Sequence, residues 1–140
     1  MKNKSISKLK KELDKYFSLY IRLRNATKTG LCQCVTCGKV GHYKKGGMQC
    51  GHFQSRKNLA TRWNEDGNCE VQCVKCNMSS GSGEQWQFGL YIDSKYGEGR
   101  AEELQYLART IIKISRIDYE EKIAYYKSLV NKIKKQKGIE

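Results

Sequence analysis

The chain has 140 residues, a length that fits one domain or one small core with helical extensions. A mean hydropathy of −0.74 and the absence of a long apolar run exclude a membrane span. Lysine and arginine outnumber aspartate and glutamate by 27 to 14, and the net charge of +13 indicates a polyanionic partner. Nucleic acid is the first interpretation. An anionic membrane surface and a merely solvated lysine-rich surface are the alternatives.

The amino-terminal residues show no secretory signal, because residues 1–16 lack an apolar core. The chain nevertheless contains seven cysteines, several of them in closely spaced pairs. In a reducing compartment, such pairs bind metal more often than they form disulfides. We therefore expect a cytoplasmic protein that uses cysteines as metal ligands.

The predicted elements divide the chain into three parts. Residues 1–30 contain a basic helix from residue 7 to about residue 28, since apolar side chains recur there with a helical period. Residues 31–83 are rich in glycine, cysteine and asparagine, which is typical of a small metal-organised core. A turn at Gly46-Gly47 would place residues 49–53 on the returning strand of a hairpin. Residues 84–140 are helical again, over 84–96, over 100 to about 115, and from about 118, where Asp118 and Glu121 would form a capping box before a lysine-rich tail.

Two Cys-x-x-Cys pairs, Cys34/Cys37 and Cys73/Cys76, have the spacing of a structural zinc site. A core of about fifty residues buries too little apolar surface to fold alone. One zinc ion would supply on the order of 10–16 kcal/mol of coupled binding and folding free energy. Buried, inert cysteines are the alternative, and Cys32 leaves the register of the first pair ambiguous. Two further cysteines have no such partner and are expected to pack in the core: Cys50 and Cys69.

His52 lies inside the loop that the zinc would close. An imidazole with a pKa near neutrality can take a proton from water and direct hydroxide at a phosphodiester. That reaction also needs a divalent cation with oxygen ligands. Asn77, directly after Cys76, offers a side-chain carbonyl, and Asn68 could support the loop or orient the imidazole. The alternative for His52 is a structural role, for instance as a zinc ligand.

The order His52, Asn68, Cys73-x-x-Cys76-Asn77 resembles the HNH, or His-Me finger, nuclease motif with its zinc knuckles. Residues 20–24, 51–56, 63–66 and 72–77 are also similar to the NinG (Rap) family of lambdoid phages. The resemblance covers residues 12 to about 107. It implies an α+β fold in which a zinc-stapled ββα-metal core is flanked by amino- and carboxyl-terminal helices. It also implies a phage or prophage endonuclease that cuts branched recombination intermediates, such as Holliday junctions, in a bacterial host.

The resemblance assigns a role to each matching position. His52 becomes the general base, Asn77 a ligand of the catalytic Mg²⁺ or Mn²⁺, and Asn68 the support of the loop. Most HNH enzymes carry an acidic ligand before the histidine, where this chain has Gly51. Glu70 stands where the family commonly has histidine. We expect Glu70 to replace the missing ligand, from a strand that lies beside the strand of His52.

Basic side chains near the expected site are candidate phosphate contacts: Arg22, Arg24, Arg56, Lys57 and Arg62. Surface solubility is the alternative for each of them. Four aromatic residues are expected in the core rather than in base stacking: Trp63, Trp86, Phe88 and Tyr91. Symmetric cleavage of a four-way junction needs two active sites, so a homodimer is expected. The competing interpretations are a non-catalytic zinc-finger nucleic-acid-binding protein and an RNA-binding or interaction module.

Overall fold

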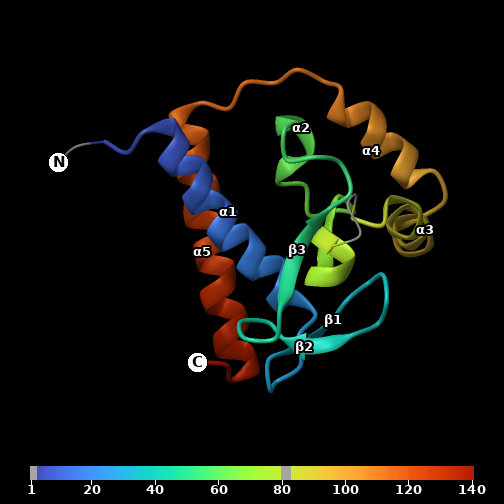
Figure 1. Ribbon diagram of the computed structural model, residues 1–140. Helices are drawn as coiled ribbons and strands as arrows, with labels where there is room; N and C mark the ends of the chain where they lie inside the picture. Colours follow the sequence, from blue (N-terminus) through green and yellow to red (C-terminus); the bar gives the residue numbers. More distant parts are fainter. Residues whose placement is uncertain (1–2, 80–82) are drawn as a thin grey trace.

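The computed structural model describes residues 3–79 and 83–140, which form an α+β fold with small two-stranded sheets (Figure 1). The described strands are β1 (Leu31–Gln33), β2 (Val40–His42), β3 (Met48–His52) and β4 (Cys69–Cys73). The described helices are α1 (Ile6–Arg24), α2 (Leu59–Arg62), the π-helix η1 (Lys75–Ser79), α3 (Gln85–Tyr96), α4 (Arg100–Ala108) and α5 (Arg116–Lys137). None of the described helices has the length and apolarity of a membrane span.

Helices α1 and α5 lie side by side and run in the same direction (Figure 1). The start of α5 is tied to the start of the chain by a hydrogen bond from the Arg116 guanidinium to the carbonyl of Lys4. Between the helices, the rings of Phe17 and Tyr126 meet edge to face with centroids 5.0 Å apart. At the other end, the Lys137 ammonium donates to carbonyls in and just after the last turn of α1: Leu23, Arg24 and Ala26.

Three helix boundaries differ from the expected ones, and a capping box explains the last of them. The first helix ends at Arg24, four residues earlier than the predicted end near residue 28. The helix from Arg100 ends at Ala108 rather than near residue 115. The last helix starts at Arg116, because Ser115 and Asp118 form the capping box. The predicted box of Asp118 with Glu121 is therefore wrong.

The two sheets are antiparallel ribbons in which β1 pairs with β2 and β3 pairs with β4. Residues 48–52 form a strand, as the predicted hairpin requires, but this strand does not pair with β2 across Gly46-Gly47. In its register with β4, His52 faces Cys69 and Gly51 faces Glu70. The expectation that the strands of His52 and Glu70 are neighbours is confirmed.

A small separate core joins α3 and α4 to the loop after β3. Phe53, Phe88, Ile92 and Leu104 are buried there. Trp86, which was expected in the core, is instead 77% exposed, because it lies on the outer side of α3. The larger core lies between α1, α5 and the β3–β4 ribbon.

Candidate metal and catalytic site

The structure brings together the four cysteines of the two Cys-x-x-Cys pairs. The Sγ atoms of Cys34, Cys37, Cys73 and Cys76 all lie within 4.8 Å of one another. The Sγ atoms of Cys37 and Cys73 are 3.7 Å apart. A tetrahedral zinc with Zn–S bonds of about 2.3 Å separates its sulfur ligands by about 3.8 Å. The quartet therefore fits a structural metal such as zinc.

Backbone geometry prepares the first of these cysteines for a cation. The turn after β1 closes with a hydrogen bond from Gly38 N–H to the Cys34 carbonyl, and Gly38 adopts a φ of +81°. Burial raises the pKa of the Cys34 thiol, but backbone N–H donors, chiefly those of Cys37 and Cys73, outweigh burial and lower this pKa to about 7. Burial raises the pKa of the Cys76 thiol. This shift favours the protonated thiol. A bound divalent cation would instead favour the thiolate, because metal binding displaces thiol protons.

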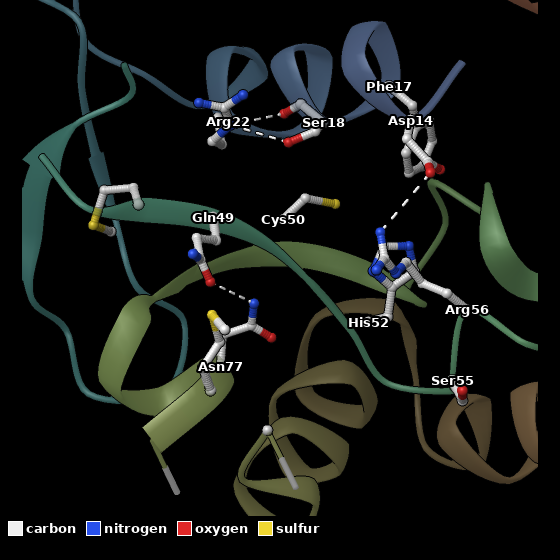
Figure 2. Close-up of a pocket in the computed structure, with 13 residues that line it drawn as sticks. Asp14, Phe17, Ser18, Arg22, Gln49, Cys50, His52, Ser55, Arg56 and Asn77 are labelled. Carbon is white, nitrogen blue, oxygen red and sulfur yellow. Dashed lines mark hydrogen bonds and ion pairs between the residues drawn. The ribbon is translucent and has the colours of Figure 1, made fainter. Parts of the chain in front are cut away.

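A cavity of about 710 Å³ lies between α1, β3 and η1. His52, from the end of β3, and Asn77, from η1, both line it (Figure 2). Arg22, Arg56 and Asp14 lie on its walls as well. The structure thus brings two of the three predicted catalytic residues to one pocket whose walls carry positive charge.

The imidazole of His52 is held by the backbone. Its Nε2 lies 2.9 Å from the carbonyl oxygen of Arg62, an atom that can only accept, so Nε2 carries the hydrogen and Nδ1 the lone pair of the neutral ring. Burial lowers the pKa of His52, and the nearby Arg56 and Arg62 guanidinium groups lower it further against the opposing effects of this hydrogen bond and of Asp14. The ring is therefore neutral at pH 7 and able to accept a proton.

Asn68 is completely buried beneath the loop that follows His52. Its side-chain oxygen accepts a hydrogen bond from Gln54 N–H at 2.8 Å, and its amide donates to the carbonyl of Thr61 at 2.8 Å. The remaining contacts described for this side chain go to the Gln54 carbonyl and the Cys69 thiol. Asn68 thus binds the backbone on both sides of the loop.

The side-chain amide of Asn77 donates to Gln49 Oε1 at 2.8 Å (Figure 2). This bond fixes the orientation of the side chain and directs Oδ1, the better cation ligand, away from Gln49. Asp14 supplies the carboxylate among the described residues that line the pocket. This carboxylate accepts hydrogen bonds from the Arg62 guanidinium and from Trp63 Nε1. Of the two amide side chains that line the described part of the pocket, Gln49 uses its oxygen to accept from Asn77, and Asn77 offers its own oxygen to a divalent cation.

Glu70 lies elsewhere. Side chains alternate along a strand, so Glu70 points to the face of the ribbon opposite to that of Cys69 and His52. Its carboxylate, 1% exposed, is 3.2 Å from both Arg24 Nη2 and Lys95 Nζ and accepts from Tyr96 Oη at 2.6 Å. Burial and this hydrogen bond raise the pKa of Tyr96 to about 12. The structure does not bring Glu70 to the pocket, so it is not retained as the replacement ligand.

Gly51 occupies its position for a steric reason. A Cβ atom there would lie 2.7 Å from Gln72 Cδ and closer still to Oε1. Gln72 is itself fixed, because its amide donates to Thr36 Oγ1 at 2.9 Å and to the carbonyl of Gly83 at 2.8 Å. An acidic side chain cannot enter beside His52 while Gln72 keeps this conformation.

Two of the predicted phosphate contacts are anchored inside the protein. The Arg24 guanidinium binds Glu70 and the carbonyls of Glu65 and Cys69. The Arg62 guanidinium forms an ion pair with Asp14 at 2.6 Å. Their positive charges are already neutralised by buried or half-buried carboxylates, which leaves little for a phosphate.

Of the other three predicted contacts, Arg56 and Lys57 are exposed, whereas Arg22 is half-buried and also donates to the Tyr43 carbonyl. Arg56 lines the pocket with a side chain that is 64% exposed, although it also lies 3.8 Å from Asp14. Lys57 is exposed beside it. Arg22 lines the same pocket and donates to the Ser18 carbonyl and hydroxyl. The cations that line the pocket are therefore Arg22 and Arg56, and the exposed Lys57 follows Arg56 in the sequence.

A cysteine cluster that the spacing did not indicate lies beside His52. Cys50 and Cys69 pack in the core as expected, but their Sγ atoms and a ring nitrogen of His52 lie within 4.8 Å of one another. Burial raises the pKa of Cys69 well above its ordinary value. The Cys50-x-His52 spacing, which places both side chains on one face of a strand, is the signal that would have pointed to it.

One family model matches the sequence. It is described as bacteriophage lambda NinG protein, and the match covers residues 1–137. No curated protein and no solved structure matches the chain.

Proposed function

The chain belongs to the bacteriophage lambda NinG family, and from this premise we propose that it is a metal-dependent DNA endonuclease of the HNH type. Its substrates would be branched recombination intermediates such as Holliday junctions, cut by a homodimer in the cytoplasm of a bacterial host. The observation that carries the proposal is that His52 and Asn77, from β3 and η1, line one pocket with exposed arginine at its edge. The succession of two paired strands and a short helix also supports a ββα-metal assignment.

His52 is the proposed general base. Its Nε2–H is occupied by the Arg62 carbonyl, so Nδ1 is the atom that would take the proton from the attacking water. Asn68 would act through the loop, because its hydrogen bonds hold the backbone directly after His52. Arg56 and Lys57 would hold the phosphates beside the scissile bond.

Asn77 is the proposed protein ligand of the catalytic Mg²⁺ or Mn²⁺, through Oδ1. When bound, the cation would neutralise the phosphate and stabilise the leaving oxygen. Magnesium accepts a site with few protein ligands when water and substrate phosphates supply the rest. The cation would therefore bind much more tightly with DNA than without it.

The ion-paired state of Asp14 favours a second candidate, a non-catalytic zinc-finger nucleic-acid-binding protein. Within the described part of the pocket, no carboxylate is left for a cation once Asp14 binds Arg62 and Trp63. A protein that only binds DNA needs the basic surface and the zinc centre but neither a free ligand nor a base.

The decisive experiment compares nicking of a labelled four-way junction and of a matched linear duplex in Mg²⁺ or Mn²⁺. Wild type, His52→Ala and His42→Ala are assayed after zinc content and folding are verified. His42 is the matched control, since its ring accepts from backbone N–H groups in the turn after β2. Junction cleavage by wild type and His42→Ala but not by His52→Ala is expected. If no variant cuts yet all bind DNA with steep salt dependence, the binding protein is the better description.

A further inference from the structure

The face of the β3–β4 ribbon that bears His52 carries a second set of potential metal ligands. We propose that Cys50, His52 and Cys69 form a site for Zn²⁺, distinct from the four-cysteine centre. The register explains the grouping. His52 and Cys69 are direct cross-strand partners, and Cys50 lies two residues from His52 on the same face of β3.

The distances suit a metal with modest side-chain adjustment. The ligand atoms lie within 4.8 Å of one another. Around a tetrahedral zinc, two sulfur atoms lie about 3.8 Å apart, and a sulfur and a nitrogen lie about 3.5 Å apart. Rotation of the Cys50 side chain, which is only half-buried, can close the difference without moving the paired strands.

The donor set selects the metal. Thiolate and imidazole favour Zn²⁺ and similar soft or borderline ions, whereas Mg²⁺ and Mn²⁺ favour oxygen. Three protein ligands leave the fourth position open for water or another ligand. Cys50 and His52 line the 710 Å³ cavity, so the ion can enter from that side, while Cys69 forms the fully buried base of the site.

Groups around the cluster already hold its ligands. The Arg62 carbonyl accepts from the His52 ring and also, at 3.5 Å, from the Cys69 thiol, a bond that the thiol gives up when a metal displaces its proton. The Asn68 amide lies 3.8 Å from the Cys69 sulfur, where it can support a thiolate. Such outer contacts orient ligands in metal sites.

A consequence follows that rests on the proposed nuclease function. A histidine bound to zinc cannot also accept a proton from water. Zn²⁺ in this site would therefore inhibit cleavage while Mg²⁺ or Mn²⁺ supports it. The chain would bind one zinc ion that stabilises its fold and a second zinc ion that inhibits DNA cleavage.

The site is tested first by counting zinc. The full chain is equilibrated with excess Zn²⁺ under reducing conditions, freed of unbound metal by gel filtration, and assayed for zinc per chain. Wild type should retain two ions, whereas Cys50→Ala and His52→Ala should retain one. Cys32→Ala is the matched control, because Cys32 is a buried cysteine outside both clusters, and it should retain two.

Each result decides the question. One zinc per wild-type chain, or two in Cys50→Ala, would overturn the proposal. The zinc that remains in a variant reports that the four-cysteine centre, and with it the fold, is intact. If Cys50→Ala loses both ions, His52→Ala gives the answer on the opposite side of the cluster.

Activity supplies a second, separable readout. Nicking in Mg²⁺ is measured with and without micromolar Zn²⁺, and each variant is compared with its own zinc-free rate. Zinc should lower the nicking rate of wild type and of Cys32→Ala at least tenfold. It should lower the nicking rate of Cys50→Ala less than twofold. Equal inhibition of all three would remove the inhibitory role. If wild type never cuts, the nuclease proposal fails while the zinc count still stands.

Discussion

Glu70 shows at the scale of one residue how a potential ligand becomes a structural group. Its carboxylate joins Arg24 of α1, on one side, to Lys95 and Tyr96 of α3 on the other. The two cations and the hydroxyl all bind Oε1 of this buried carboxylate, on the face of the ribbon opposite to that of His52. Its contribution is to connect two helices that are far apart in the sequence.

Glu70→Gln should therefore lower stability and leave the metal requirement unchanged. Removing one partner of a buried ion pair costs about 3–5 kcal/mol, because the remaining charge stays buried. Glu103→Gln, which breaks the exposed pair with Arg100, should cost at most about 1 kcal/mol. Urea unfolding of zinc-saturated protein measures both changes. A Glu70→Gln variant with wild-type stability and an altered cation dependence would return Glu70 to the list of ligands.

The pKa of His52 predicts a pH–rate profile. Cleavage needs the neutral ring, so the rate should rise with pH and reach half its maximum below pH 6.5, the ordinary value for histidine. Burial is the main cause of this shift, and the Arg56 charge adds to it. In Arg56→Ala the midpoint should move to higher pH, whereas Lys57→Ala should leave it in place. Single-turnover rates between pH 5 and 8 test this, and a wild-type midpoint above 6.5 would contradict it.

Close contact between Gly51 and Gln72 predicts a steric coupling. Gly51→Ala should cost about 1–3 kcal/mol in the free energy of unfolding, since a Cβ atom would overlap the Gln72 amide. In a Gln72→Ala background, Gly51→Ala should lower the free energy of unfolding by much less. A double-mutant cycle by urea unfolding measures the coupling. Additive costs would mean that Gly51 is required for another reason.

At the scale of elements, the α1–α5 pair is closed at one end by a single side chain. Lys137 Nζ donates to the carbonyls of Leu23, Arg24 and Ala26, at and just beyond the end of α1, where helix carbonyls lack their usual N–H partners four residues on. Lys137→Met keeps the aliphatic part of the side chain but removes the donor. It should lower the free energy of unfolding by about 1–2 kcal/mol. Lys135→Met, at an exposed position of the same turn, should change stability by less than about 0.5 kcal/mol. Thermal unfolding compares the two, and equal effects would show that the cap is not specific.

The sequence predicts some of these elements better than others, for physical reasons. The cysteine quartet was predictable, since Cys-x-x-Cys spacing alone brings two sulfur atoms to one ion. The side of the sheet that Glu70 faces was not, because it depends on the register of β4 against β3. The ion pair of Arg62 with Asp14 was also not predictable, since Asp14 lies 48 residues away in the sequence, on α1. Helix ends were missed where a serine cap outweighs periodicity, as at Ser115.

For the whole molecule, the zinc centre carries the prediction with the largest effect. The quartet joins the segment after β1 to the end of β4 and the start of η1. Zinc binding of on the order of 10–16 kcal/mol is comparable to the total stability of a domain. Excess EDTA should therefore abolish the dispersed NMR spectrum, and added Zn²⁺ should restore it. Cys32→Ala should respond as wild type does, whereas a native-like spectrum without metal would contradict a structural role.

The pairing of α1 with α5 also bears on how the chain is made. A contact such as that between Lys137 and Leu23 spans 114 residues, and α1 leaves the ribosome long before α5. During that interval the apolar face of α1, with Leu13 and Phe17, has no helix to cover it. Contacts this distant slow folding and prolong exposure of apolar surface. Nascent chains halted before residue 116 should therefore be the form of this protein that chaperones hold and that aggregates most readily.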